Sequence, residues 1–237
     1  MMRGHTRSIG WGMAVVTLLV FGLLGAWQLQ RMARKQDLLA AADAALQAPP
    51  IALARALERK GAPVQRISDH GRFLPGVVLL DNQMRHGRAG VKIYRPFQSD
   101  AGAVVLADLG WRVLPPDRAL PALPPPPSPV AVTGLLAPAP AAGLALGPAM
   151  VEAGPGRWLA ARLHPAALGP PLGLRALPEQ VLRLDPALPF GDARDLDLLP
   201  NTLPPQRHLG YAVQWFGLAL TVLIVALVLE WRRRPAR

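Results

Sequence analysis

Two long runs of apolar residues, one near each end of the chain, dominate the pattern of hydrophobic and polar positions. Residues 9–29 and residues 209–229 are each 21 residues long and contain no charged side chain. A helix that rises ~1.5 Å per residue covers roughly 31 Å over such a run, about the thickness of the hydrocarbon core of a bilayer. Neither run shows the polar face of a surface helix in a soluble protein. The pattern therefore predicts one transmembrane helix at each end.

Aromatic residues stand near the ends of both runs, where amphipathic rings favour the lipid headgroup region. Trp11 and Trp27 lie near the two ends of the first run. Tyr211 and Trp215 lie toward the start of the second run, and Trp231 follows its end. This placement is typical of helices that cross a membrane.

A cleaved signal peptide is the alternative for the first run. Basic residues precede the run, and residues 24–26 (Leu-Gly-Ala) form a passable cleavage region. The run is longer than the usual apolar core of a signal peptide, and the polar, helix-compatible residues 28–35 follow it directly. Both features favour a transmembrane helix.

The basic residues near the two runs predict which side of the membrane the termini occupy. Six flank the runs on the terminal side and four on the side of the central region: Arg3, Arg7, Arg232, Arg233, Arg234 and Arg237 against Arg31, Arg34, Lys35 and Arg207. Because cytoplasmic segments carry the excess of Lys and Arg, we expect cytoplasmic termini. Only eight residues precede the first run, which leaves no room for an organelle transit peptide and favours a bacterial plasma (inner) membrane.

The central region begins with helical patterns and continues with patterns typical of strands. Residues 31–46 are strong helix formers that end before Pro49 and Pro50, and residues 51–59 predict a second, short helix. The β-rich runs 77–80, 91–97 and 104–113 are separated by turn signals, which predicts a three-stranded antiparallel meander. Further strands are expected at residues 130–136, 157–162 and, more weakly, 180–184, so that sheet dominates after residue 70.

The segment 115–129 (PPDRALPALPPPPSP) is too rich in proline for a helix or a central strand, because proline lacks an N–H donor and fixes φ. We interpret it as an extended, polyproline-like loop that serves as a spacer rather than as a docking site.

The expected fold is therefore an α+β membrane protein in five parts. A cytoplasmic tail (1–8) precedes transmembrane helix 9–29, a β-rich extracytoplasmic domain with short helices (30–208), transmembrane helix 209–229 and a basic cytoplasmic tail (230–237).

Composition and charge exclude several classes of protein. The formal net charge of +11 raises the question of nucleic-acid binding, but the basic residues outside the two tails are scattered and form no basic helix or aromatic-interleaved patch. The chain has no cysteine, which excludes disulfides, thiolate metal sites and a cysteine nucleophile. No nucleotide-binding glycine loop, metalloprotease motif or GxSxG is present, so we do not expect an enzyme.

His208 is the candidate for cofactor chemistry among five dispersed histidines. It lies one residue before the second apolar run, with Tyr211 at i+3 and Trp215 at i+7, and these three share one arc of a helix. A neutral imidazole at an apolar boundary, beside rings that can pack on a macrocycle, is suited to be an axial ligand of haem iron. The alternative is an ordinary interfacial position, since His, Tyr and Trp are common there.

Gln28, with Trp27, is the candidate on the first run for a contact that faces the partner helix. Hydrogen bonding to lipid headgroups is the alternative for Gln28. In the third predicted strand, Gly110 is expected to relieve a close approach and Trp111 to pack in the core, so that this stretch has a structural role.

Four segments resemble the Surfeit locus protein 1 family, assembly factors of haem-copper cytochrome c oxidase. They are LLGAWQLQRMARKQDLL (23–39), residues 71–83 leading into GVKIYRPF (90–97), VVLADLGWRVLP (104–115) and HLGYAVQWFGLAL (208–220). Two departures limit the likeness. Leu109 stands where the family usually has an arginine, so no role of that arginine is carried over, and residues 115–205 match only loosely.

The resemblance implies a membrane-bound chaperone that assists delivery or retention of haem a during its insertion into the oxidase catalytic subunit. It implies that His208 contacts the haem iron, that Tyr211, Trp215, Trp27 and Gln28 line the pocket between the helices, and that haem a synthesis enzymes are partners besides the catalytic subunit and the lipid bilayer. The competing hypothesis is a membrane-anchored scaffold that holds an assembly intermediate without binding haem. A membrane-anchored hydrolase is the third class, and no nucleophile-base pairing in the sequence favours it.

Overall fold

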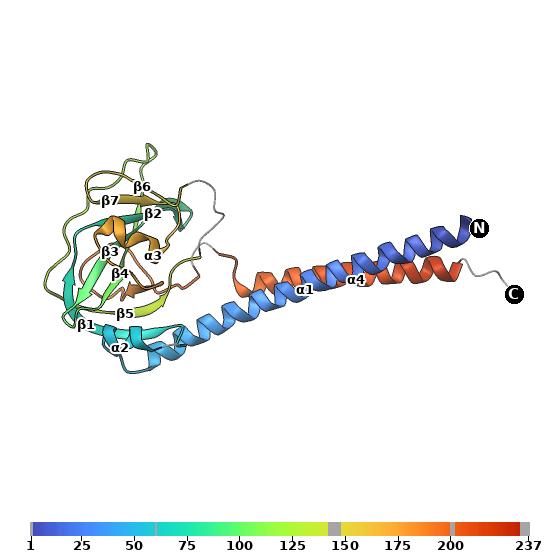
Figure 1. The fold of residues 1–237 in the computed structure, drawn as a ribbon, viewed down its shortest axis with the longest axis horizontal. Helices are drawn as coiled ribbons and strands as arrows, with labels where there is room; N and C mark the ends of the chain where they lie inside the picture. Colours follow the sequence, from blue (N-terminus) through green and yellow to red (C-terminus); the bar gives the residue numbers. More distant parts are fainter. Residues whose placement is uncertain (1, 60, 142–147, 200–201, 233–237) are drawn as a thin grey trace. The chain divides into compact units, whose positions relative to one another are not determined.

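The computed structural model describes residues 2–59, 61–141, 148–199 and 202–232, which form two compact units (Figure 1). The first, called the helical unit below, combines Met1–Asp37 with Thr202–Arg237. The second, called the β-domain, is Leu38–Asn201.

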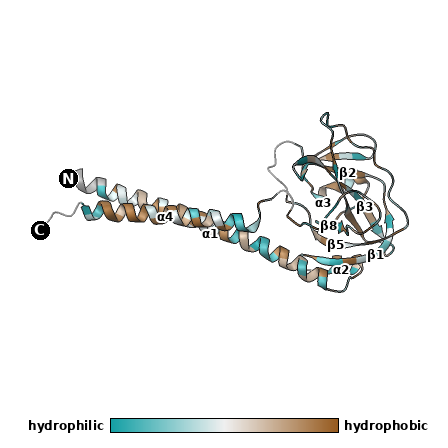
Figure 2. Ribbon diagram, turned by 180° about the vertical axis from the view of Figure 1, so that it is seen from behind, coloured by the Kyte–Doolittle hydropathy of each residue, from teal (hydrophilic) through white to brown (hydrophobic). Residues whose placement is uncertain are grey.

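Two long helices make up the helical unit. Helix α1 spans Met2–Gln47 and α4 spans Pro205–Arg232. Both apolar runs are therefore helical, and α1 continues through residues 31–46 as the sequence predicts. Figure 2 shows apolar residues along both helices, which are long and apolar enough to cross a membrane by length and composition.

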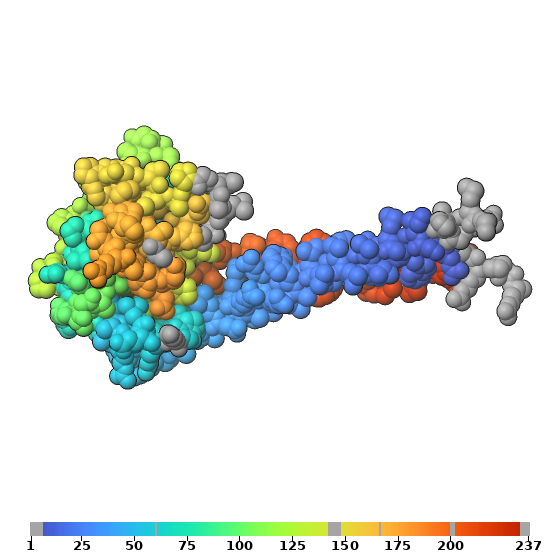
Figure 3. Space-filling model, in the orientation of Figure 1, coloured from blue at the N-terminus to red at the C-terminus, as the bar shows by residue number. Residues whose placement is uncertain are grey.

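The two helices lie side by side and run antiparallel (Figure 3). At one end, Arg7 Nη2 pairs with Glu230 Oε1 at 2.6 Å, and Trp11 Nε1 donates to Glu230 Oε2 at 3.3 Å. Farther along, the rings of Phe21 and Trp215 lie 5.5 Å apart between centroids. Polar contacts thus pair the helices beyond the end of the second apolar run, and ring packing holds them together within it.

The β-domain contains one eight-stranded sheet in the order β1-β5-β8-β4-β3-β2-β7-β6. The strands are β1 (Gln65–Phe73), β2 (Val77–Arg85), β3 (Arg88–Ser99), β4 (Val104–Val113), β5 (Val130–Pro138), β6 (Met150–Glu152), β7 (Arg157–Ala160) and β8 (Gln180–Leu184). An additional antiparallel pairing of β1 with β3 closes β1, β5, β8, β4 and β3 into a barrel. Strands β2, β7 and β6 extend the sheet beyond the barrel.

Most of the predicted strands are confirmed, and the meander is β2, β3 and β4 with antiparallel pairing throughout. The sheet begins earlier than the sequence suggested, because β1 starts at Gln65 rather than after residue 70. Its sequence, QRISDHGRF, is rich in polar and charged residues, and only its pairing with β5 and β3 makes it a strand. The short strand β6 was also not predicted.

Short helices accompany the sheet. Helix α2 is Leu53–Glu58, shorter than the predicted 51–59, because Ile51 forms a parallel bridge with Ile67 of β1 instead. The turn of helix α3 (Pro165–Leu168) and the 3-10 turn η1 (Pro170–Leu172) were not predicted.

The Pro-rich segment 115–129 contains no helix or strand, as predicted. Two arginine side chains hold it against the domain. Arg157 Nη2 donates to the carbonyl oxygen of Pro121 at 2.8 Å, and Arg112 Nη1 donates to that of Ala122 at 2.8 Å. The segment is thus a fixed part of the β-domain, which the interpretation as a spacer did not anticipate.

Apolar side chains fill both faces of the sheet. The main core cluster lies inside the barrel and includes Ile67, Ile93, Phe97, Leu136, Leu182 and Leu184, with Leu53 and Ala56 of α2 packed against it. A second cluster covers the other face and joins Val78, Leu80, Tyr94 and Leu106 to Leu168 of α3. This alternation follows from the two-residue period of a strand.

A buried ion pair lies on that second face. Lys92 Nζ is 2.9 Å from Asp108 Oδ2, with side-chain exposures of 8% and 3%. The other carboxylate oxygen accepts the N–H of Gly110 at 3.0 Å. Burial, followed by the charge of Asp108, raises the pKa of the neighbouring Tyr94 hydroxyl. A carboxylate so enclosed is costly to leave without its partner.

Gly110 has the structural role that the sequence predicted, whereas Trp111 was expected in the core and belongs to none of the core clusters. Gly110 has φ +118, and a Cβ there would lie 2.5 Å from the carbonyl oxygen of Asp192. Trp111 is partly buried and donates Nε1–H to the carbonyl oxygen of Gln83 at 2.7 Å.

Replacing Asp108 with alanine should lower the free energy of unfolding by about 3 to 5 kcal/mol, because the Lys92 ammonium is then buried without its counterion. Denaturant unfolding of the purified protein in detergent micelles measures this loss. Asp100→Ala is the matched control, since that carboxylate is exposed, and its effect should stay within about 0.5 kcal/mol. Equal stabilities of the two variants would contradict a structural role for the ion pair.

Candidate functional site

The candidate site is built where the start of α4 lies against α1 in the helical unit. His208 Nδ1 is 2.8 Å from Oε1 of Gln28. Because an amide oxygen only accepts, Nδ1 carries the proton and donates it, which leaves the lone pair on Nε2. The structure therefore brings together His208, the candidate for cofactor chemistry, and Gln28, the candidate for a contact with the partner helix.

The second ring nitrogen of His208 has no partner among the described residues. Nε2 is buried without a hydrogen bond, and the residue as a whole is 8% exposed. Buried polar atoms in proteins are nearly always hydrogen-bonded, so an imidazole nitrogen with a free lone pair is an unusual feature. The free Nε2 fits a metal that takes one neutral imidazole, and the hydrogen bond from Nδ1 to Gln28 would fix the tautomer of the ring.

Burial and the positive charges nearby favour the neutral form of His208. His208 precedes the apolar run 209–229, and burial, then the charges of Lys35 and Arg31, lower the pKa of its imidazole. Burial and Arg31 likewise lower the pKa of Lys35, whose Nζ donates to the carbonyl oxygen of Leu203. A neutral ring is the form that can ligate a metal.

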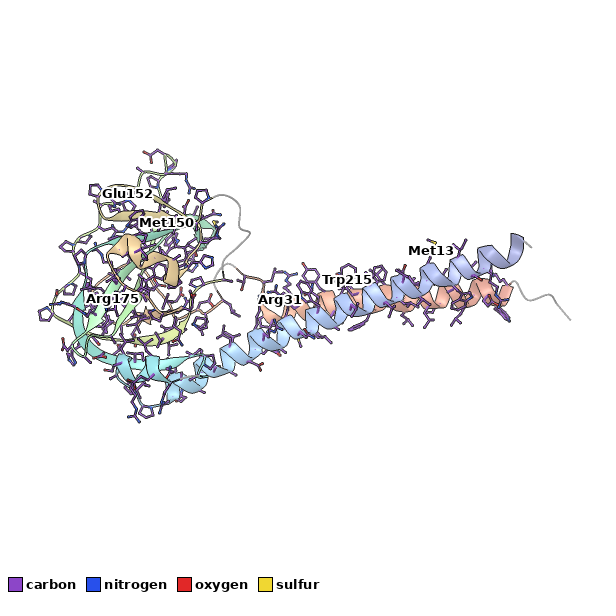
Figure 4. All side chains as sticks on the ribbon, in the orientation of Figure 1. Met13, Arg31, Met150, Glu152, Arg175 and Trp215 are labelled. Carbon is purple, nitrogen blue, oxygen red and sulfur yellow. The ribbon has the colours of Figure 1, made fainter. Side chains whose placement is uncertain are left out.

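The other three predicted site residues, Trp215, Trp27 and Tyr211, lie on the helical unit but do not take part in the hydrogen bond between Gln28 and His208. Trp215 packs on Phe21, whereas Trp27 is 47% exposed and lies beneath Arg31, whose Cζ is 5.2 Å from the ring centroid. Tyr211 is 39% exposed. Figure 4 labels three residues that lie along the unit in the order Met13, Trp215 and Arg31.

Sequence reasoning missed the residues that bring the helices close together at this point. A Cβ on Gly25 would lie 2.7 Å from the ring of Phe216, so a larger residue there would displace this ring. The signal was available, because Gly25 precedes Gln28 by three positions and so lies on the same side of the helix. Phe21 and Lys35 were also missed, at i−7 and i+7 from Gln28.

Among the described residues, no group of three or more His, Asp or Glu side chains could hold a metal ion. A metal bound by His208 would therefore have to bring its other ligands with it, as haem iron does.

Comparison with known proteins identifies one family. The model of the SURF1 family matches residues 15–220. A SURF1-like protein of Rickettsia bellii (strain RML369-C) is 30% identical over 100 residues, which are 41% of this chain and 41% of the relative. A SURF1-like protein of Rickettsia felis (strain ATCC VR-1525 / URRWXCal2) is 31% identical over 100 residues, 41% of this chain and 43% of the relative. The aligned part of the chain spans less than half the length of either relative.

A double-mutant cycle should detect the bond between Gln28 and His208. Gln28→Leu and His208→Leu together should destabilise the protein less than the sum of the single changes, with a coupling energy of about 0.5 to 1.5 kcal/mol, as for hydrogen bonds between membrane helices. The free energy of unfolding in detergent micelles measures the coupling.

Thr17→Val and Thr221→Val form the control cycle. Each hydroxyl donates to a carbonyl of its own helix, to Met13 and Gly217 respectively, so their coupling should be close to zero. A Gln28–His208 coupling no larger than that of the two threonines would count against the bond.

Proposed function

Since this chain belongs to the SURF1 family, whose members are generally cytochrome oxidase assembly factors, we propose that it assists the assembly of haem-copper cytochrome c oxidase. Its two long apolar terminal helices and its separate β-rich domain suit a membrane-anchored assembly factor.

The finer part of the proposal is that the protein delivers or retains haem a during its insertion into the catalytic subunit. The observation that carries it is the buried Nε2 of His208, which has no hydrogen-bond partner among the described residues and holds a free lone pair. A bound haem would supply an iron that the imidazole nitrogen of His208 could ligate.

Each of the other candidate residues has a role in this proposal. Gln28 accepts a hydrogen bond from Nδ1–H of His208 and so holds the ring in the tautomer that leaves Nε2 free to bind. The exposed rings of Trp27 and Tyr211 and the ring of Trp215 offer apolar faces to a porphyrin. Burial, followed by the charges of Lys35 and Arg31, lowers the pKa of His208 and so favours its neutral form.

We place both helices across the bacterial plasma (inner) membrane, with the termini cytoplasmic and the β-domain extracytoplasmic. The antiparallel pairing of α1 and α4 supports two crossings, since it leaves both termini at one end of the helical unit. The excess of arginine on the terminal side of the two apolar runs supports the orientation. Under this placement His208 lies at the outer boundary of the hydrocarbon region.

The proposed partners are the catalytic subunit of the oxidase and the enzymes that make haem a. A scaffold that holds an assembly intermediate without binding haem is the second candidate function. The observation that favours it is the β-domain, a compact unit with its own core that could dock on a partner whether or not the helices bind haem.

His208→Ala should abolish the haem absorption spectrum of the protein purified from cells that also express haem a synthesis enzymes, because the axial nitrogen is lost. His70→Ala is the control, since His70 lies on the exposed side of β1 in the β-domain, and it should leave the spectrum unchanged. Absorption spectroscopy and circular dichroism on the same samples separate loss of haem from loss of fold.

His208→Met keeps a side chain that can ligate iron and should retain haem with a shifted spectrum. Spectra that are identical in all three variants would remove His208 from the mechanism. Co-purification of oxidase subunits without any chromophore, in cells with ample haem a, would support the scaffold instead.

Single cysteines test the orientation, because the natural chain contains none. In intact spheroplasts, Arg175→Cys in the β-domain should react with a membrane-impermeant maleimide, whereas Ala236→Cys near the C-terminus should react only after permeabilisation. The opposite pattern would reverse the proposed topology, and labelling of both sites in intact spheroplasts would argue against cytoplasmic termini.

A further inference from the structure

A pocket of about 200 Å³ lies beside the barrel core, between strands β3 and β4 and the Pro-rich segment. Ile93 and Leu109, which belong to the core cluster, line it together with Phe190. Residues 123–127, Leu-Pro-Pro-Pro-Pro, line it as well. We call it the Arg95 pocket after the cation that lines it. It belongs entirely to the β-domain, so it is separate from His208.

Arg95 has an unusual environment for a cation in a folded domain. Its side chain is half-buried, and among the described residues it donates no hydrogen bond and forms no ion pair. Burial, followed by the charge of Arg157, lowers the pKa of its guanidinium, which nevertheless stays protonated at neutral pH. A second arginine therefore adds to the positive potential at the pocket instead of balancing it.

The other charged groups of the pocket are already engaged with each other. Asp192 is the single acidic residue among those that line it, and its Oδ1 accepts from Nε and Nη2 of Arg112 at 2.8 and 2.6 Å. Arg112 also donates to the carbonyl oxygen of Ala122. Arg157 donates Nη2–H to Pro121, and its buried Nε has no partner among the described residues. The pocket thus keeps an unmatched positive charge.

The walls restrict what can balance this charge. Residues Pro124 to Pro127 have no N–H, so they present ring carbons and carbonyl oxygens, and Leu123 and Phe190 add apolar surface. A cavity of about 150 Å³ is enough for a benzene molecule, so the Arg95 pocket has room for a molecule of one six-membered ring with a small substituent. A guanidinium fork matches a carboxylate, with which it forms two parallel hydrogen bonds.

From these features we propose that the Arg95 pocket binds a small organic carboxylate, a free molecule with one carboxylate and a compact apolar body. The carboxylate pairs with Arg95, and the apolar body packs against the prolines, Leu123 and Phe190. This site is independent of haem and goes beyond the role in oxidase assembly.

Benzoate and its uncharged analogue benzyl alcohol are the probes, titrated by calorimetry into the full-length protein in detergent micelles, with empty micelles as the blank. We expect saturable binding of benzoate, and binding of benzyl alcohol at least about tenfold weaker. Arg95→Met keeps most of the side-chain volume but removes the charge, and should weaken benzoate binding about tenfold or more, as expected for a lost charge-assisted hydrogen bond.

Arg175→Met is the matched control, since Arg175, labelled in Figure 4, is an exposed arginine of the same domain outside the pocket, and it should bind benzoate like the natural chain. Leu123→Trp fills the pocket while keeping Arg95, and should also abolish binding. This second variant tests the pocket even if Arg95→Met fails to fold. The absence of saturable benzoate binding, or equal binding by Arg95→Met and Arg175→Met, would overturn the proposal. Binding of a peptide C-terminal carboxylate without binding of benzoate would also overturn it, in favour of a protein partner.

Discussion

Strand β3 is the element on which the β-domain depends. It is hydrogen-bonded to β2 along its first half, to β4 along almost its whole length, and to β1 at its end, and the last pairing closes the barrel. The two-residue period of the strand then decides the position of its side chains. Lys92 and Tyr94 face the buried polar cluster with Asp108, whereas Ile93, Arg95 and Phe97 face the barrel core and its pocket. A shift of one residue would exchange these two environments, so the ion pair and the core together fix the register.

The helical unit follows a different rule, because two apolar helix surfaces have little preference for one register over another. Its specificity comes from a few contacts that only one alignment can make. Arg7 pairs with Glu230 beyond the apolar run at one end, Gly25 admits the ring of Phe216, and Gln28 bonds to His208 near the other end. The same hydrogen bond that selects the alignment also sets the tautomer of His208. The proposed chemistry therefore depends on one of the contacts that pair the helices.

Much of this architecture could be predicted from local patterns. The two apolar runs and the meander have strong periodicity or β-branched content, and each was found where it was expected, as was the more weakly predicted β8. Strand β1 could not be recognised, because its polar residues become a strand only through partners far along the chain. At the site, His208 and Gln28 were each identified separately. Their contact could not be predicted, because they are 180 positions apart and meet only through the pairing of two helices. Nothing in the sequence around Arg95 marks it as a binding residue. The pocket that it lines forms only when distant parts of the chain come together, and only then is the lack of a counterion apparent.

The way in which the Pro-rich segment is attached has a consequence for the solubility of the β-domain. Four consecutive residues from Pro124 offer carbonyl groups but no N–H, and two arginines nearby bond to the carbonyls just before them. A segment without donors cannot serve as a template for a strand of another molecule, since a β-ladder needs both groups. The Arg95 pocket is thus lined on one side by a stretch of chain that cannot join the intermolecular sheets through which β-rich proteins aggregate.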